Sequence, residues 1–153
     1  MTRDQQTLDP LHLIREISTR AAVAVGLAGV GLIHLLDSIG KYDETRYLFW
    51  MYVALIIGSL ATAGAVLFSR ARGPFLAAAA LAASALIGYV LSRTTGLPHA
   101  TDDIGNWTEP LGLASLFVEG AVVATSLAAY AILPAPARTT ARRLQAVALP
   151  GPA

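Results

Sequence analysis

Residues 47–69 read YLFWMYVALIIGSLATAGAVLFS, and this stretch decides the fold. It contains no charged side chain. A helix needs about 20 apolar residues, at 1.5 Å of rise per residue, to cross the hydrocarbon core of a bilayer. Aromatic residues gather at its start, as they do where a membrane helix meets the water interface. We therefore expect residues 47–69 to form a membrane-spanning helix.

Three further segments have the same apolar character. They are residues 21–36, 75–91 and 111–133. Over the 153-residue chain, 55% of residues are hydrophobic, 14% are charged and the mean hydropathy is +0.58. A soluble domain of this size could not cover so much apolar surface. Because the connections are short, successive helices should run antiparallel. The expected fold is all-α, an integral membrane antiparallel four-helix bundle.

The segments before and after the four spans have their own signals. Residues 1–20 contain Asp9, which suits a helix N-cap, and Pro10, which suits the first helical turn. We expect them to form a cytoplasmic interfacial helix that leads into the first span. A cleavable signal peptide is the alternative, but twenty residues are long for its charged region. Residues 134–153 form a basic tail, for which we expect disorder.

Positive charges are divided unevenly between the two sides that four spans would create. One side holds Arg3, Arg15, Arg20, Arg70, Arg72, Arg138, Arg142 and Arg143, and the other holds Lys41, Arg46 and Arg93. Flanks rich in Lys and Arg stay in the cytoplasm. We therefore expect a multi-pass protein of the plasma (inner) membrane with both termini cytoplasmic. Arg20, at the edge of the first apolar segment, should extend its guanidinium toward the lipid headgroups.

Composition also excludes some functional classes. The net charge is +1 and the basic residues form no continuous stripe, so nucleic acid is not an expected partner. The chain has no cysteine, which excludes disulfides, thiolate metal sites and thiol redox chemistry. The expected partners are the lipid bilayer and either a second membrane protein or further copies of the chain.

Glu119 is the most unexpected polar residue in the spans. It lies nine residues after Pro110, about 13 Å below the outer boundary and near the middle of the hydrocarbon core. An unpaired carboxylate at that depth is costly, so Glu119 must be protonated, paired or hydrated. It binds a proton or ligand in one interpretation. In the other, it makes a packing hydrogen bond to a neighbouring helix.

His34 and Asp37 form a second group at the end of the first span. Their spacing of three residues places both side chains on one face of a helix, where they can bind Zn, Fe or Mn. A weaker set of metal ligands is His99, Asp102 and Asp103. The alternative is a local hydrogen bond from His34 beside the outer loop. Haem and iron–sulfur centres lack their ligands, because no second histidine lies in a span and cysteine is missing.

These residues converge on one side of the expected bundle. We predict an outward-facing polar pocket, roofed by the connection 92–109, that binds a small ligand or a divalent metal ion. The pocket residues are His34, Asp37, Arg93, Glu109 and Glu119. No motif names a reaction, so catalysis is left open. The alternative function is an accessory or structural subunit of a larger membrane complex, with no chemistry of its own.

Three features of the second half of the chain carry a resemblance. They are SRTTGLP at residues 92–98, EPLGL at residues 109–113, and Glu119 within the last span. Together they resemble a group of small, uncharacterised four-helix integral membrane proteins common in actinobacteria. In that group the first helix also ends with a histidine followed by another polar residue, as His34 and Asp37 do here. The resemblance implies the four-helix fold and no particular activity.

Overall fold

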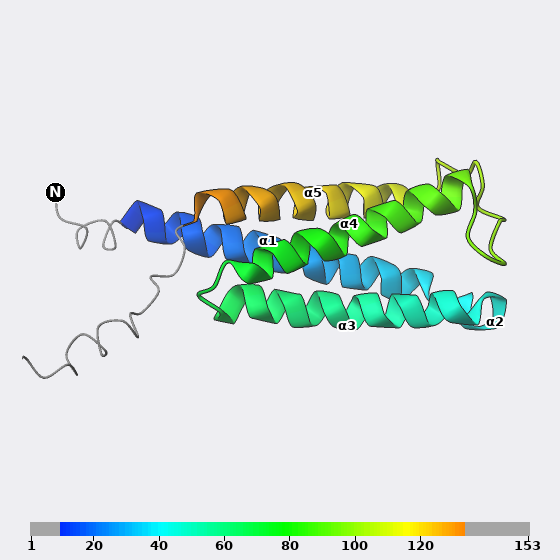
Figure 1. Ribbon diagram of the computed structural model, residues 1–153, viewed down its shortest axis with the longest axis horizontal. Coiled ribbons are helices and arrows are strands. Elements are labelled where there is room, and N and C mark those ends of the chain that lie inside the picture. The colour runs from blue at the N-terminus through cyan, green and yellow to red at the C-terminus, as the bar shows by residue number, and fades with distance from the viewer. Residues whose placement is uncertain (1–9, 134–153) are drawn as a thin grey trace, which may run out of the picture.

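The computed structural model describes residues 10–133, and over this range the chain is helical (Figure 1). The helices are α1 (Pro10–Asp37), α2 (Lys41–Glu44), α3 (Arg46–Phe68), α4 (Gly73–Thr94) and α5 (Pro110–Ile132). Within residues 10–133 there is no strand, only an isolated bridge between Leu97 and Ala100. The all-α class is therefore confirmed. The expected N-cap at Asp9 and the tail 134–153 lie outside the described residues.

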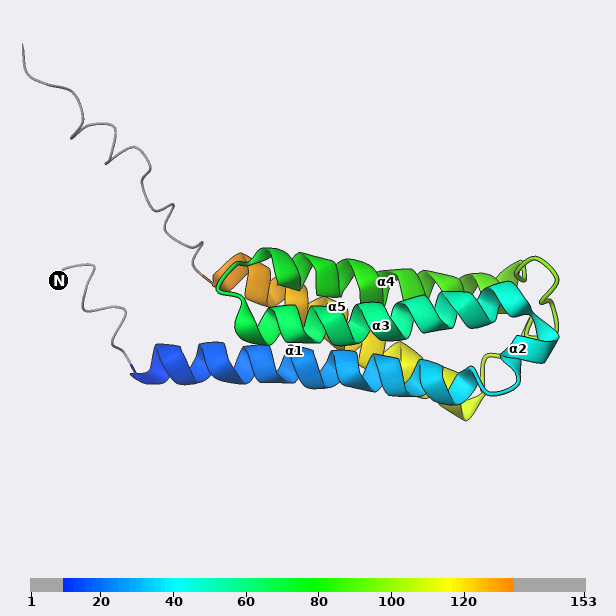
Figure 2. The same ribbon diagram turned by 90° about the horizontal axis from the view of Figure 1, so that it is seen from below.

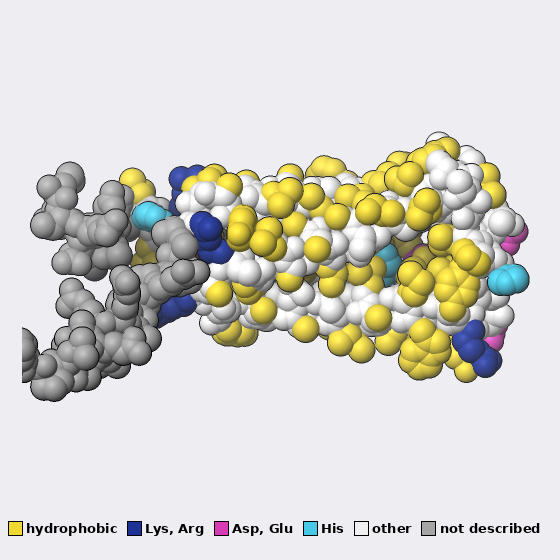
Figure 3. Space-filling model, viewed as in Figure 1, with side chains coloured by type: hydrophobic (Ala, Val, Ile, Leu, Met, Phe, Trp, Pro, Cys, Tyr) yellow, Lys and Arg dark blue, Asp and Glu magenta, His cyan; other side chains and the backbone are white. Residues whose placement is uncertain are grey.

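Four of these helices, α1, α3, α4 and α5, are long and apolar enough to cross a membrane. The shortest of them has 22 residues, which corresponds to about 33 Å of helix. Their side chains leave much apolar surface open: Phe68 is 88% exposed and Phe117 is 78% exposed. In Figure 3, hydrophobic side chains cover the sides of the molecule while Lys and Arg gather near its ends. Length, composition and outer surface all suit a lipid environment.

The segment before the first apolar span and the span itself form one helix. We expected an interfacial helix that leads into the first span, and the structure has an unbroken α1 of 28 residues from Pro10 to Asp37. No proline or glycine pair interrupts it near Arg20, where the division was expected. The start of α1 extends past the ends of the other long helices (Figure 2).

The four long helices pack side by side as a helical bundle (Figures 1 and 2). Both α1 and α4 contact α3 and α5. At one end lie α2 and the connection 95–109, and we call this the loop end. At the other end lie the start of α1, the connection 69–72 and the end of α5, and we call this the arginine end. Between the ends, the core encloses Leu27, Val66 and Phe75, each 0% exposed.

Glycine allows close packing of neighbouring helices at several positions. A Cβ atom at Gly26 would lie 2.5 Å from Val122 of α5, and one at Gly58 would lie 2.8 Å from Leu81 of α4. A larger residue at either position would require Val122 or Leu81 to shift. At Gly120 of α5, by contrast, no described atom lies within 4 Å of the Cβ position, so that face of α5 points away from the bundle.

Two arginines hold the arginine end together. Arg20 donates to the backbone carbonyls of Val66 (2.7 Å) and Ser69 (2.8 Å) at the end of α3. Arg72 donates to the carbonyl of Leu133 (2.8 Å), just after α5. The last carbonyls of a helix lack partners within it and carry partial negative charge, so a guanidinium there stabilises the end. Arg20 was expected to reach for headgroups, but its guanidinium binds α3 instead.

Candidate functional site

His34 of α1 and Glu119 of α5 meet inside the bundle toward the loop end. The His34 Nε2 atom lies 3.8 Å from Glu119 Oε1. The His34 side chain is 11% exposed and the Glu119 side chain 1% exposed. Each side chain continues the buried face of its helix: His34 follows Val30 and Gly31, and Glu119 lies between Ser115 and Val122. The buried faces of α1 and α5 point toward each other, so both side chains lie inside the bundle.

The two oxygens of Glu119 have different surroundings. The Ser115 hydroxyl, one turn earlier on α5, donates to Oε1 at 2.6 Å. The second oxygen, Oε2, is buried and accepts no hydrogen bond from any residue in the range 10–133. A buried polar atom without a partner costs free energy, and such atoms are uncommon in folded proteins. Oε2 is therefore an open acceptor inside the bundle.

The orientation of His34 is set by its own helix and by α3. Its Nδ1 atom lies 2.9 Å from the carbonyl oxygen of Val30. A carbonyl only accepts, so Nδ1 must carry the hydrogen and the neutral ring presents the Nε2 lone pair to Glu119. The Tyr52 ring packs edge-on against the imidazole at 5.1 Å between centroids. His34 Nε2 and the Glu119 carboxylate are then both hydrogen-bond acceptors, and they face each other without a donor. A donor placed between them would bind to both.

Asp37 and Tyr52 lie between this pair and the loop end. Asp37 is the last residue of α1, one turn beyond His34. The Tyr52 side chain approaches the Asp37 carboxylate and is close enough to Asp103 and Arg93 to interact with their charges. Tyr52 therefore lies between the buried pair and the charged groups of the loop end.

Arg93 organises the connection between α4 and α5. Its guanidinium binds Asp103 (Nη1 to Oδ2, 2.8 Å) and approaches Glu109 (Nη2 to Oε2, 3.6 Å), and Arg93 is 8% exposed. Glu109 is the N-cap of α5 and accepts from the backbone N–H groups of Leu111 (2.9 Å) and Gly112 (2.6 Å). One arginine thus fixes the end of α4, the connection and the start of α5.

The five residues of the predicted pocket divide into two groups. His34 and Glu119 form a buried pair, whereas Arg93 and Glu109 form an ion pair at the rim. Asp37 lies with Tyr52 between them. The two cavities described below lie at the arginine end and not around these residues.

The structure does not support the expected metal ligands. Over the described range, no three His, Cys, Asp or Glu side chains come together in a way that could hold a metal ion. His99 and Asp102 are exposed in the connection, and Asp103 is paired with Arg93. His34 directs Nδ1 to its own backbone, so it offers only Nε2, beside a single carboxylate. The residues that could bind a metal are therefore spread over separate places.

Sequence reasoning missed two residues of the site. Ser115 is four residues before Glu119, and that helical spacing alone would have identified it as a candidate partner. Tyr52 is one of the aromatic residues at the start of residues 47–69, which we expected at the water interface of the membrane. It is instead half-buried and faces His34, while Trp50 is 58% exposed. The rotation of α3 about its axis decides which aromatic side chain faces inward. Because α3 is apolar on all sides, its sequence has little periodicity from which this rotation could be predicted.

Comparisons of this chain with known protein families, curated proteins and solved structures gave no match. The resemblance to the small actinobacterial membrane proteins therefore stays a hypothesis.

Proposed function

We propose that the chain is a plasma-membrane protein whose four long helices cross the bilayer as an antiparallel bundle, with both termini in the cytoplasm. The uneven placement of positive charge supports this orientation. Within residues 10–133, the arginine end holds Arg15, Arg20, Arg70 and Arg72, and the loop end holds Lys41, Arg46 and Arg93. The arginine end is then the cytoplasmic end, because Lys and Arg flanks are retained there.

We further propose that this protein binds a small cationic ligand at Glu119 and His34. The main support for this proposal is that the Oε2 atom of Glu119 is buried and accepts no hydrogen bond from the described residues. An ionisable residue in the middle of a membrane bundle is a candidate functional site, and an incomplete set of hydrogen bonds supports a ligand there. A positively charged donor would satisfy Oε2 and neutralise the carboxylate.

The geometry restricts the chemistry of the ligand. It must donate one hydrogen bond to Glu119 Oε2 and, if it also bridges the pair, a second to His34 Nε2. Ammonium, a protonated primary amine and a hydrated proton all carry several donors on one centre. A divalent metal ion would find one carboxylate and one imidazole here, fewer ligands than metals such as zinc take from protein. A nitrogen- or oxygen-centred cation is therefore the better match.

Access to the pair is from the loop end. His34 lies one turn from the end of α1, whereas Glu119 lies more than two turns from the start of α5. The carboxylates of Asp37 and Asp103 lie on this side and attract cations toward it. In the space-filling view, a histidine side chain is visible in a recess between the helices toward the loop end (Figure 3).

A stability screen tests this function. The purified protein in mild detergent would be heated with ammonium, methylammonium, sodium or potassium chloride at constant ionic strength. A ligand at 100 times its dissociation constant stabilises the folded state by about 2.7 kcal/mol. We expect one of the nitrogen cations to raise the melting temperature of the wild type and of Glu44→Gln, which changes an exposed acid of α2. We expect no such increase for Glu119→Gln. Equal effects on all three proteins, or none on the wild type, would contradict the proposal.

The accessory-subunit alternative has one observation in its favour. Gly88 of α4 and Gly120 of α5 face away from the bundle, with no described atom within 4 Å of either Cβ position. Small residues on an outer face let a partner helix approach closely. Light scattering of the detergent complex separates the two functions. A stable heteromeric complex that Gly120→Leu disrupts, with no response to cations, would favour the accessory role.

A further inference from the structure

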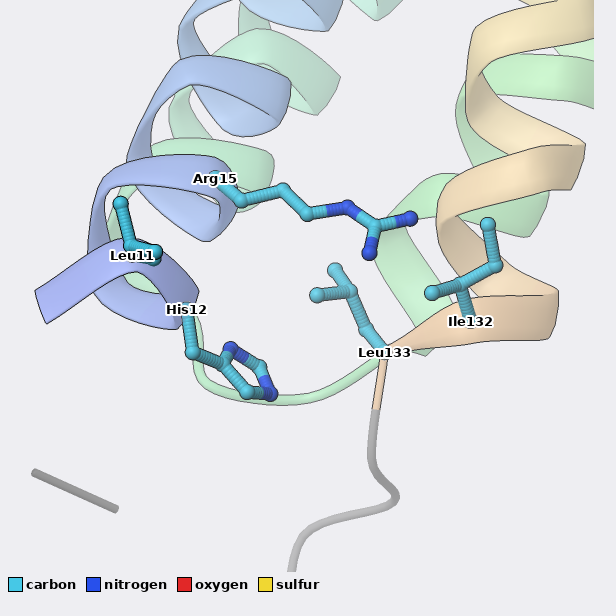
Figure 4. Close-up of a pocket in the computed structure, with 5 residues that line it drawn as sticks. All are labelled: Leu11, His12, Arg15, Ile132 and Leu133. Carbon is cyan, nitrogen blue, oxygen red and sulfur yellow. The ribbon is translucent and has the colours of Figure 1, made fainter. Parts of the chain in front are cut away.

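A groove opens between α1 and α5 at the arginine end, far from the His34–Glu119 pair. It has a volume of about 260 Å³ and is lined by Leu11, His12, Arg15, Ile132 and Leu133. In Figure 4, the Arg15 side chain reaches from α1 across the groove toward Ile132 on α5. The groove therefore has largely apolar walls, His12 at its outer end and the Arg15 guanidinium across it.

A second cavity of about 170 Å³ extends the groove along the two helices. It shares Arg15, Ile132 and Leu133 with the first. Its other lining residues are Thr19, Thr125, Ala128 and Ala129. From Leu133 back to Thr125 is eight residues, about 12 Å along α5. The two cavities follow one another along α1 and α5, from the arginine end toward the middle of the bundle.

Arg15 differs from the other two arginines that contact the bundle at this end. Arg20 binds the end of α3 and pairs with Glu16, and Arg72 binds the carbonyl of Leu133. Among residues 10–133, no acidic side chain forms an ion pair with Arg15. Its charge is therefore available to a ligand that enters the groove.

The depth of the groove matches the boundary of a bilayer. Arg20 lies at the level where α3 ends, because it binds the carbonyls of Val66 and Ser69. Arg15 is five residues closer to the start of α1, about 7.5 Å farther out. If α3 crosses the bilayer, Arg15 lies at headgroup level and the Thr125 end of the groove lies among acyl chains.

We propose that this groove binds one anionic phospholipid, with its phosphate on Arg15 and an acyl chain along Thr19, Thr125 and Ala128. The site rests on the proposed membrane insertion but not on the proposed cation site. A groove with a cation between its outer part and its apolar inner part is complementary to a lipid, which carries an anionic head on an apolar chain. Basic pockets between membrane helices on the cytoplasmic side bind such headgroups.

Native mass spectrometry of the full chain tests the proposal. The protein would be released from detergent after incubation with phosphatidylglycerol or phosphatidylethanolamine of identical acyl chains. We expect one phosphatidylglycerol per protein, bound more tightly than the zwitterionic lipid. One basic residue near an anionic headgroup is worth about fivefold in affinity, so Arg15→Gln should weaken binding by about that factor. Arg70→Gln removes the same charge from the exposed connection at the same end and should leave binding unchanged.

A second pair of variants tests the acyl chain. Ala128→Trp fills the groove without changing the charge, and we expect it to abolish the bound lipid. Ala121→Trp places the same side chain two turns deeper on α5, outside the groove, and should have no effect. Both alanines are exposed, so the bundle should fold in either variant, as circular dichroism would show.

Several outcomes would overturn the lipid site. Equal losses in Arg15→Gln and Arg70→Gln would show a diffuse attraction to the basic end and no built site. Retention of lipid by Ala128→Trp would exclude the groove. Full competition by glycerophosphoglycerol, which lacks acyl chains, would show that only an anion is bound. A protein dimer that excludes lipid would make a second copy the occupant.

Discussion

The two polar contacts of Glu119 should contribute very differently to stability, although the shorter one looks stronger. Ser115 donates to Oε1 at 2.6 Å, but both residues belong to α5. His34 lies at 3.8 Å and belongs to α1. When a membrane bundle comes apart, its helices persist as separate helices in the lipid. The Ser115 contact therefore survives unfolding, whereas the His34 contact is lost.

Two double-mutant cycles measure this difference. One combines His34→Phe with Glu119→Met, and the other combines Ser115→Ala with Glu119→Met. Phe keeps a ring against Tyr52, and Met keeps the length of Glu without its oxygens. Polar contacts between membrane helices average about 0.6 kcal/mol and reach about 1.7 kcal/mol. In buffer that contains ammonium chloride, which supplies a donor between the two acceptors, we expect a favourable coupling free energy in that range for His34 and Glu119. For Ser115 and Glu119 we expect less than about 0.3 kcal/mol, below the usual additivity error.

The assay is unfolding by increasing mole fraction of sodium dodecyl sulfate in mixed micelles, followed by loss of tertiary signal. Helical circular dichroism must stay nearly constant through the transition, which checks that the helices persist. A Ser115–Glu119 coupling equal to or larger than the His34–Glu119 coupling would refute the reasoning. It would mean either that α5 unravels on unfolding or that α1 and α5 do not bring the pair together.

Three further predictions concern the two ends of the bundle. Arg20→Met removes two hydrogen bonds to the end of α3 and should lower the free energy of unfolding by about 1–3 kcal/mol. Arg15→Met in the same assay should change it by less than about 0.5 kcal/mol, and equal effects would contradict the capping role of Arg20. Arg93→Gln should release the connection 101–109 and speed its amide exchange by about tenfold, equivalent to about 1.4 kcal/mol, with Arg46→Gln as the unchanged control. An impermeant maleimide should label single cysteines at Thr101 and Ala71 from opposite sides of the membrane, and labelling of both from one side would exclude the topology.

The helices could be predicted from the sequence because apolar length is a local property. Residues 47–69 contain no charge or proline, so nothing in them stops a helix, and α3 occupies Arg46–Phe68. Pro110 likewise marked the start of α5 correctly. The continuity of α1 was harder to predict, because Arg20 looked like a boundary. Its positive charge is in fact accommodated by carbonyls of α3, a contact between distant parts of the chain.

The site was only partly predictable for the same reason. His34 and Glu119 stood out because a polar residue in an apolar segment is costly, and the structure brings these two together. Which residues contact them depends on how each helix is rotated about its axis. Tyr52 faces inward and Trp50 outward from the same turn of α3, and nothing in that apolar stretch distinguishes them. Arg93 was placed in the pocket, but it is held by two acids at the rim.

The central claim is that Glu119 offers a buried acceptor that a small cation occupies. Infrared difference spectroscopy tests it most directly, by recording the protein in lipid before and after addition of ammonium chloride, with sodium chloride as the reference. If the claim is right, ammonium changes the carboxyl bands of the wild type and of Glu44→Gln, and the change is missing from Glu119→Gln. The same carboxyl change in Glu119→Gln, or no ammonium-specific change in the wild type, would contradict the claim.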